Sequence, residues 1–333
     1  MPVPLSVLDL APIAPGQDAR DSFAASVALA RAAEATGHTR VWYAEHHNMA
    51  SIASSATAVL IGHVADHTET IRLGAGGVML PNHAPLTIAE QFGTLETLHP
   101  GRIDLGLGRA PGSDQPTMRA MRRDPSSSDR FPDDVLELQA YLRGQSRVPG
   151  VQAVPGAGTD VPLYILGSSL FGAQLAAAFG LPYAFASHFA PDHLLEAVDI
   201  YRRDFKPSEQ LDAPYVLAAV NVVAADDADE ARTQFEQTRR TRVRGMLQRR
   251  PGDAEGYTDQ EIDAFLATPQ GRGIANMMRC SAVGAPDEVR EQLEAFAVEA
   301  RADELIVAHQ SPQTADRLRS VELTAAAMLG AAA

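Results

Sequence analysis

Short runs of β-branched and aromatic residues alternate along the chain with longer segments whose apolar residues recur at helical spacing. Residues 22–36, for example, place Phe23, Val27 and Ala30 on one helical face, and Gly37 follows as the expected end of that helix. The runs that predict strands are 5–10, 40–45, 71–80, 102–108, 162–168, 181–189, 214–225 and 304–309. The segments that predict helices are 22–36, 54–68 (opened by a Ser cap), 85–101, 131–144, 169–180, 191–205, 226 into the 240s, 286–302 and 312–329.

The order of these segments predicts the fold. Strands that are joined by helices pair in parallel, and eight of them with a helix after the last are typical of a closed (β/α)8 TIM barrel, an α/β fold. An open, doubly wound sheet is the alternative. We expect a single domain over residues 1–333, with insertions near the barrel mouth at 110–160 and 248–285, which exceed the usual connection length.

Composition narrows the classes of function. The chain has 333 residues, of which 45% are hydrophobic, enough to bury a core without disulfides or metals. Its 42 acidic and 28 basic residues give a net charge of −14, which argues against a nucleic-acid binder. Cys280 is the only cysteine, so an internal disulfide and any zinc site with two cysteines are excluded. With no basic leader and no 18-residue apolar run, the protein is expected to be cytoplasmic, without a membrane partner.

Active sites of TIM barrels lie at the carboxyl ends of the strands, and a pair of histidines follows the second predicted strand. An imidazole titrates near neutrality and suits proton transfer, which makes His46 a candidate catalytic residue. Because side chains alternate in direction along a strand, His46 and His47 cannot both point inward. A structural histidine in a loop is the alternative.

Two further strand ends offer groups that could bind a phosphate. Arg109 follows the fourth strand among glycines, where a guanidinium could hold a phosphate; a surface ion pair is the alternative. Ser168 and Ser169 follow the fifth strand and could cap the next helix, whose first amides favour an anion. Together these residues form a plausible phosphate site. The glycines of 102–114 match a dinucleotide fingerprint poorly, since their spacing is wrong and Pro111 interrupts the turn.

Three other motifs have a structural and a functional interpretation. Gly76 and Gly77 lie inside the third predicted strand. Glycines there indicate a bulge, a strained peptide or close approach of a ligand, and simple packing against a helix is the alternative. His63 and His67 have the spacing of zinc ligands but lack the glutamate of metalloproteases, so we interpret them as surface residues and expect no catalytic metal. Residues 239–250 carry six arginines, which we interpret as the solvated end of a helix; docking of an acidic partner or a phosphate is the alternative.

Three motifs, considered together with their order along the chain, indicate a resemblance to a known protein family that extends over most of the sequence. They are W-Y-A-E-H-H (42–47), G-G-V-M-L-P-N-H-A-P (76–85) and H-P-G-R-I-D-L-G-L-G-R (99–109). The chain resembles the luciferase-like flavin-dependent monooxygenases, the barrel family that includes bacterial luciferase. The resemblance implies FMN at the barrel mouth, supplied in its reduced form by a flavin reductase.

The resemblance also implies roles for single residues. His46 would assist oxygenation of the flavin, Arg109 and Ser168 (or Ser169, one residue on) would bind its phosphate, and Gly76-Gly77 would form a cis peptide against the isoalloxazine ring. The reactive cysteine of luciferase is replaced here by Gly108, so no role of that thiol transfers.

The expected function is therefore an FMN-dependent monooxygenase, which inserts one oxygen atom from O2 into a small organic substrate. The alternatives are hydride transfer with a deazaflavin coenzyme, flavin binding without catalysis and, as an outsider, an NAD-dependent dehydrogenase. By analogy with the family, a homodimer is expected through residues 54–68 and 85–99. The sequence does not reveal the organic substrate.

Overall fold

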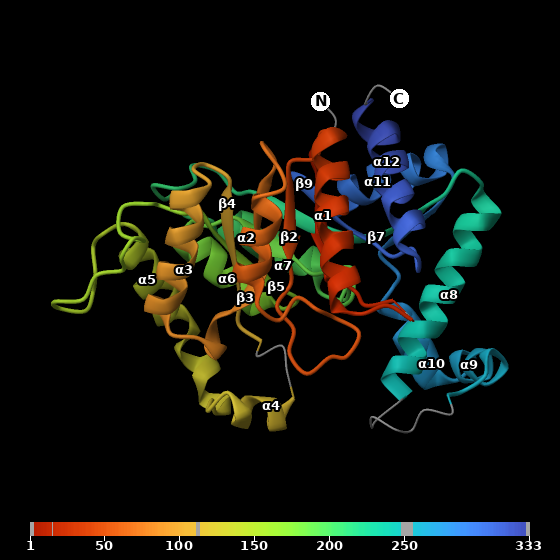
Figure 1. Ribbon diagram of the computed structural model, residues 1–333, viewed down its shortest axis with the longest axis horizontal. Coiled ribbons are helices and arrows are strands. Elements are labelled where there is room, and N and C mark those ends of the chain that lie inside the picture. Colours follow the sequence, from red (N-terminus) through yellow and green to blue (C-terminus); the bar gives the residue numbers. More distant parts are fainter. Residues whose placement is uncertain (1–2, 15, 111–113, 248–255, 331–333) are drawn as a thin grey trace.

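The protein is described here by a computed structural model that covers residues 3–14, 16–110, 114–247 and 256–330 (Figure 1). Its strands form one parallel sheet in the order β6-β5-β4-β3-β2-β1-β9-β7-β8, and pairing of β6 with β7 closes the sheet. The predicted (β/α)8 barrel is confirmed, and the open sheet is excluded. The strands are β1 (Leu5–Asp9), β2 (Arg40–Tyr43), β3 (Arg72–Met79), β4 (Ile103–Gly108), β5 (Leu163–Gly167), β6 (Tyr183–Phe185), β7 (Val216–Ala224), β8 (Ser281–Gly284) and β9 (Glu304–His309).

Helices cover the outside of the barrel, and several short ones lie where the strands end (Figure 1). They are α1 (Ala19–Ala35), α2 (Thr57–Ala65), the 3-10 turn η1 (Leu80–Asn82), α3 (Pro85–Leu98), α4 (Gln115–Ala120), the 3-10 turn η2 (Pro125–Arg130), α5 (Phe131–Leu142), α6 (Leu170–Phe179), α7 (Leu194–Asp204), α8 (Ala228–Leu247), α9 (Asp259–Leu266), α10 (Pro269–Asn276), α11 (Pro286–Glu299) and α12 (Thr314–Leu329). No helix of the described residues is long and apolar enough to cross a membrane.

Local sequence signals explain most helix boundaries. Asp18 and Asp21 form a capping box that opens α1, and Gly37 adopts a φ of +84° just past its end, as expected. The predicted Ser cap of α2 is wrong. The hydroxyl of Ser54 instead donates to the carbonyls of Ala44 and Leu10, which ties the β1 and β2 loops together, and α2 begins at Thr57.

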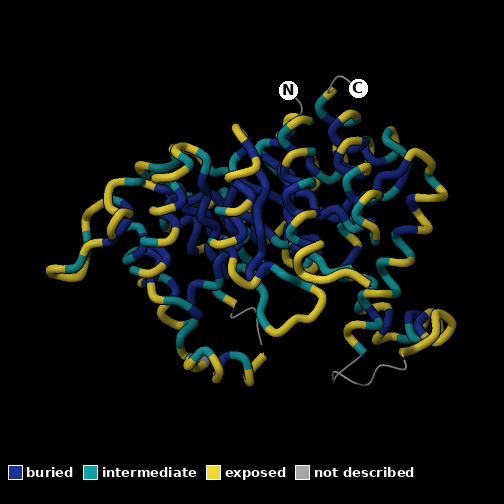
Figure 2. The backbone as a smooth tube through the Cα atoms, in the orientation of Figure 1, coloured by how far each residue is buried: buried dark blue, intermediate teal, exposed yellow. Residues whose placement is uncertain are grey.

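Buried residues gather along the strands at the centre of the molecule (Figure 2), and apolar side chains form two main clusters there. The larger core lies between the strands and the surrounding helices, and a smaller cluster around Leu8, Trp42 and Tyr164 fills the barrel interior. All nine residues of β7 are buried, because this central strand contacts helices on one face and the interior on the other.

The two long connections contain more secondary structure than the sequence predicts. Residues 110–160 hold α4 and η2 as well as the predicted helix, α5, while 248–285 hold α9, α10 and the unpredicted strand β8. β8 is only four residues long and pairs with the end of β7, alongside Asn221–Ala224, which extends beyond its partner β6. The sixth strand itself is shorter than predicted: it ends at Phe185, and a turn follows in which Ser187 donates to the carbonyl of Ala219.

Candidate functional site

A cavity of about 1050 Å³ lies at the carboxyl ends of the strands, within the size range of small-molecule sites. Its wall includes all six residues that the sequence singled out from four successive strand ends: His46, Gly76, Gly77, Arg109, Ser168 and Ser169. The structure therefore brings these residues to one cavity. Their individual roles stay predictions.

The two histidines have different surroundings, although both lie beyond the end of β2, where strand alternation does not apply. His46 lines the cavity, whereas Nε2 of His47 lies 2.8 Å from a carboxylate oxygen of Glu45. The same buried carboxylate accepts hydrogen bonds from the Met79 backbone (3.0 Å) and the Asn82 amide (3.2 Å), and it lies 2.9 Å from Nε2 of His83. Glu45 thus joins the segment after β2 to the segment after β3, and it fixes the backbone next to His46.

The environment of Glu45 favours its charged form. Burial alone would raise the pKa of this carboxyl, but hydrogen bonds from His47, His83 and the Met79 backbone outweigh that effect and lower it to about 2. In return, the hydrogen bond to Glu45 raises the pKa of His47 above its ordinary value, although desolvation opposes the change. Sequence reasoning missed Glu45, although its place beside His46 was a usable signal.

The two strand glycines form a non-prolyl cis peptide bond, as the resemblance implies. A side chain does not fit at either position. A Cβ on Gly76 would lie 2.8 Å from Cβ of Trp42, and one on Gly77 would lie 2.6 Å from the carbonyl oxygen of Gly106. The pairing of β3 with β4 shifts between Ala75 and Val78, so the backbone bulges at this point and its peptide groups face the cavity.

Arg109 lies at the end of β4 with its guanidinium carbon 4.2 Å from the centre of the Phe171 ring. The guanidinium forms no hydrogen bond or ion pair with any residue that the structure describes. Nearby, Ser169 occupies the N-cap position of α6, yet its hydroxyl makes no capping hydrogen bond, and the Ser168 hydroxyl has no partner in the described chain either. The surface ion pair and the simple helix cap are therefore both absent from the described residues.

Two cavity residues were missed as site residues by the sequence analysis. His188 follows β6 and is buried, with no hydrogen-bond partner for Nδ1 among the described residues. Burial, with the charges of Arg242 and His46 nearby, lowers the pKa of His188 to about 3, so its imidazole is neutral at physiological pH. Arg242, on α8, also lines the cavity.

Arg242 corrects the interpretation of the arginine-rich segment. Its neighbours Arg240 and Arg244 behave as solvated helix residues and form ion pairs of 2.7 Å with Asp263 and Asp259 of α9. Arg242 is half-buried instead, and burial lowers the pKa of its guanidinium. Arg249 and Arg250 lie outside the described residues.

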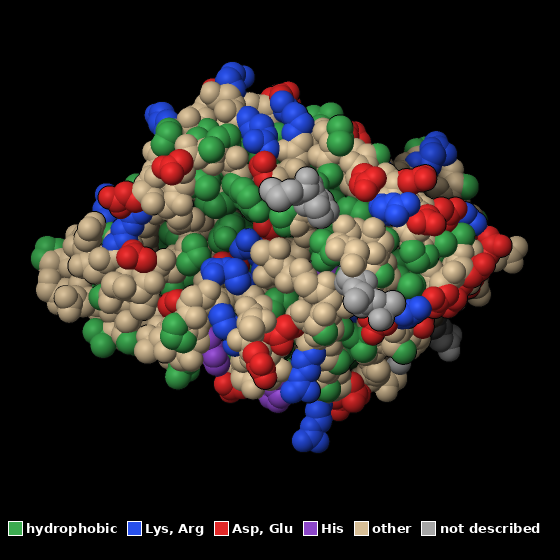
Figure 3. All heavy atoms as spheres, turned by 90° about the horizontal axis from the view of Figure 1, so that it is seen from above, with side chains coloured by type: hydrophobic (Ala, Val, Ile, Leu, Met, Phe, Trp, Pro, Cys, Tyr) green, Lys and Arg blue, Asp and Glu red, His purple; other side chains and the backbone are tan. Residues whose placement is uncertain are grey.

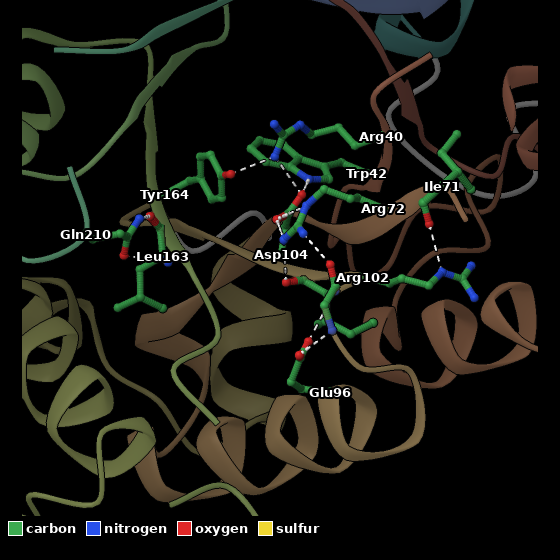
Figure 4. Close-up of polar contacts among 12 residues, drawn as sticks. Arg40, Trp42, Ile71, Arg72, Glu96, Arg102, Asp104, Leu163, Tyr164 and Gln210 are labelled. Atoms are coloured by element: carbon green, nitrogen blue, oxygen red, sulfur yellow. Dashed lines mark hydrogen bonds and ion pairs between the residues drawn. The ribbon is translucent and has the colours of Figure 1, made fainter. Parts of the chain in front are cut away.

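The opposite end of the barrel, where the strands begin, has a different polar structure. Figure 3 shows this face, with basic and acidic side chains around a hollow. Arg40 is the first residue of β2. Its guanidinium lies 2.7 Å from Asp104 and 2.9 Å from Glu304, and it donates to the Tyr164 hydroxyl (2.6 Å). Arg72 and the Trp42 indole also donate to Asp104 (Figure 4). We call this group of residues the base network.

The two histidines His63, on α2, and His67, in the turn after it, lie on the surface, as interpreted from the sequence. His63 and His67 are exposed, and their rings contact each other at 4.7 Å. Among the residues described, no three His, Cys, Asp or Glu side chains are grouped closely enough to hold a metal ion.

Comparison with known proteins agrees with this geometry. The family described as luciferase-like monooxygenase matches residues 3–304. A luciferase-like monooxygenase of Escherichia coli K12 is 49% identical over 322 residues, 96% of each chain, and an N-acetyl-S-alkylcysteine monooxygenase of Bacillus subtilis is 30% identical over 98% of each chain. The crystal structure of apo-MsnO8 superimposes with a TM-score of 0.85 at 36% identity, covering 98% of both chains. The chain belongs to the luciferase-like monooxygenase family.

Proposed function

We propose that the protein is an FMN-dependent monooxygenase that uses reduced FMN and O2 to insert one oxygen atom into a small organic substrate. The observation that carries this proposal is the position of Arg109. It is a cation without a carboxylate partner among the described residues, it stacks on Phe171, and it faces the same cavity as the uncommitted Ser168 and Ser169 hydroxyls. A terminal phosphate would give these groups a partner.

The rest of the cavity suits an isoalloxazine ring. Gly76 and Gly77 expose backbone without side chains, and His46 lines the same wall. A volume of about 1050 Å³ leaves room for a second small molecule beside the flavin. Reduced FMN, when bound, would supply the two electrons with which one atom of O2 enters the substrate and the other leaves as water.

The protein side of the chemistry is orientation, proton transfer and exclusion of water. We assign proton transfer at the flavin to the imidazole of His46. Glu45 is a positioning residue, because its hydrogen bonds to the segments after β2 and β3 hold the backbone of His46 in place. Arg109 with Ser168 or Ser169 would bind the phosphate.

The substrate and the partners are further parts of the proposal. The relative named N-acetyl-S-alkylcysteine monooxygenase makes N-acetyl-S-alkylcysteines the first substrates to test. A separate flavin reductase would supply reduced FMN, as the resemblance to the family implies. By analogy with the family, we propose a homodimer through α2 and α3, on which Val59 (74% exposed) and Leu98 (66%) are exposed apolar residues. Light scattering at micromolar concentration should give the mass of a dimer.

The test is an anaerobic titration of the protein with reduced FMN, reduced riboflavin and the deazaflavin coenzyme. We expect tight binding of reduced FMN, at least tenfold weaker binding of riboflavin, and loss of that difference in R109Q. H46A should bind reduced FMN as the wild type does, but it should lose turnover, measured as oxygen uptake with an N-acetyl-S-alkylcysteine.

Other outcomes identify the alternatives. Preference for the deazaflavin, without oxygen uptake, would assign the protein to hydride transfer. Tight FMN binding without turnover for any substrate in a broad panel would favour a flavin-binding protein. If no flavin bound, the cofactor assignment and the roles of His46 and Arg109 would be wrong.

A further inference from the structure

Arg242, on α8, lines the same cavity as Arg109 but comes from a different part of the barrel. Arg109 and Ser168 follow the ends of β4 and β5, and Phe171 lies in the first turn of α6, whereas Arg242 comes from α8, which follows β7. Gln237, Thr238 and Thr241 line the cavity from the same face of α8, because residues three and four apart on a helix lie on one side. The direction of Arg242 is therefore set by the packing of the whole helix.

That packing leaves Arg242 without a counterion. Val243, its neighbour, is buried against Ile262 and Leu266 of α9, which fixes the rotation of α8. This rotation carries Arg240 and Arg244 to carboxylates of α9 and turns Arg242 away from them. Arg242 forms no hydrogen bond or ion pair with any residue that the structure describes. A partly desolvated arginine without a partner costs free energy, which a bound anion would recover.

His188 supplies a second group at the same place. His188 and Arg242 both line the cavity, and the charge of Arg242 adds to burial in lowering the pKa of His188. Nδ1 of the neutral imidazole is buried and has no partner in the described chain, and in the tautomer that carries the proton on Nδ1 it donates one hydrogen bond. Beside it, Phe189 contacts the His188 ring edge-on at 5.0 Å, is exposed and also lines the cavity. The site therefore combines a cation, a hydrogen-bond donor and an apolar surface.

We propose that Arg242 and His188 bind the carboxylate of the substrate, and that the natural substrate is an organic acid whose apolar part lies against Phe189. This inference rests on the proposed function, in which the Arg109 side of the cavity is occupied by flavin phosphate. A guanidinium binds a carboxylate through two parallel hydrogen bonds, which orients the substrate as well as attracting it. Each arginine would thus bind a different anion: Arg109 the flavin phosphate, and Arg242 the substrate carboxylate.

The test measures binding of matched acids and amides to the full-length protein, with and without saturating FMN, by ligand-observed NMR titration. The probes are hexanoate with hexanamide and 3-phenylpropanoate with 3-phenylpropanamide, which differ in charge but hardly in shape. We expect the wild type to prefer each acid at least tenfold. R242Q should lose the preference, and R242K should keep part of it. R239Q is the matched control, because Arg239 lies on the same helix, pairs with Glu236 and does not line the cavity.

R109Q separates the two anion sites. In the presence of FMN, R109Q should keep the preference for acids while it loses the preference for FMN over riboflavin, and R242Q should do the reverse. The proposal is wrong if the wild type does not distinguish acid from amide, or if R242Q retains the preference. It is also wrong if R242Q, rather than R109Q, loses the preference for FMN over riboflavin.

The same data distinguish failure of this inference from failure of the proposed function. If no flavin binds but the acid preference persists and depends on Arg242, the carboxylate site stands and the flavin assignment is wrong. If FMN binds through Arg109 and oxygen is consumed, but acids and amides bind equally, only the carboxylate site is wrong.

Discussion

The arginines at the two ends of the barrel have different surroundings. At the base, Arg40 contacts two carboxylates and a tyrosine hydroxyl, and Asp104 in turn accepts from Arg72 and Trp42 (Figure 4). At the mouth, Arg109 has only the Phe171 ring, and Arg242 has no hydrogen-bond or ion-pair partner in the described chain. Arg40 therefore has counterions within the protein, whereas Arg109 and Arg242 have none among the described residues.

This difference separates groups that serve folding from groups that serve binding. A buried charge is tolerated when protein groups pair with it, and the base network meets that condition without any ligand. Four buried polar atoms of the cavity wall have no partner among the described residues: His188 Nδ1, His309 Nε2, Ser311 Oγ and Arg317 Nε. Their partners are then expected to come from outside the chain, as substrate, cofactor or water.

The largest effect is expected at the base. D104N removes the carboxylate that Arg40, Arg72 and Trp42 share, and it leaves a buried guanidinium underpaired. We expect the free energy of unfolding to fall by about 3–5 kcal/mol. Urea denaturation measures it, with R242Q as the comparison at the mouth. If D104N and R242Q lowered the free energy of unfolding equally, the proposed difference between the base and the mouth would be wrong.

Glu45 lies at the mouth but resembles the base network, because its carboxylate is fully paired. E45Q should lower the free energy of unfolding by about 2 kcal/mol, the value of charged hydrogen bonds, and it should reduce turnover more than FMN affinity. Since the pKa of Glu45 is lowered to about 2, its stabilisation is present above pH 4.5 and is lost as the pH falls towards 2. Acid unfolding followed by circular dichroism should show a flatter pH dependence in E45Q; an unchanged profile would contradict the assigned hydrogen bonds.

His188 should give the smallest change in stability. Its folded pKa of about 3 lies below its ordinary value of 6.5, so the unfolded chain takes up a proton first as the pH falls. The resulting loss of stability between pH 6.5 and 3 should be reduced in H188N, by up to about 2 kcal/mol at pH 5 and by very little at pH 7. Urea midpoints at pH 7 and pH 5 measure the effect, and an equal drop in both proteins would show that His188 is not desolvated.

The fold and part of the site could be predicted because both depend on local pattern. Strands 5–10 and 304–309, and the helices between them, follow from spacing, and strand ends identify His46, Arg109 and Ser168 as neighbours in a barrel. The base network could not be predicted, since Asp104 and Glu304 lie 200 residues apart within apolar runs, and only closure of the barrel brings Arg40 between them.

Tertiary packing also explains the missed cavity residues. Arg242 is one of several arginines in a basic segment. Packing of Val243 against α9 sets the rotation of α8, which pairs Arg240 and Arg244, also at the cavity wall, with carboxylates of α9 and leaves Arg242 without one among the described residues. His188 lies in a run that resembles a continuing strand, but the chain turns after Phe185 because β6 pairs over only three residues with each neighbour. The strand β8 was missed because four residues carry too little pattern.

The central claim is that Arg109 and Arg242, at the barrel mouth, bind ligands and do not stabilise the fold. R109Q tests this claim most directly. The free energy of unfolding is measured for wild type and R109Q, with and without reduced FMN under anaerobic conditions. We predict that the two proteins are equally stable without flavin, and that FMN at 100 times its Kd stabilises only the wild type, by about 2.7 kcal/mol. If R109Q were destabilised without flavin and still stabilised equally by the same concentration of FMN, Arg109 would serve the fold, and the claim would be contradicted.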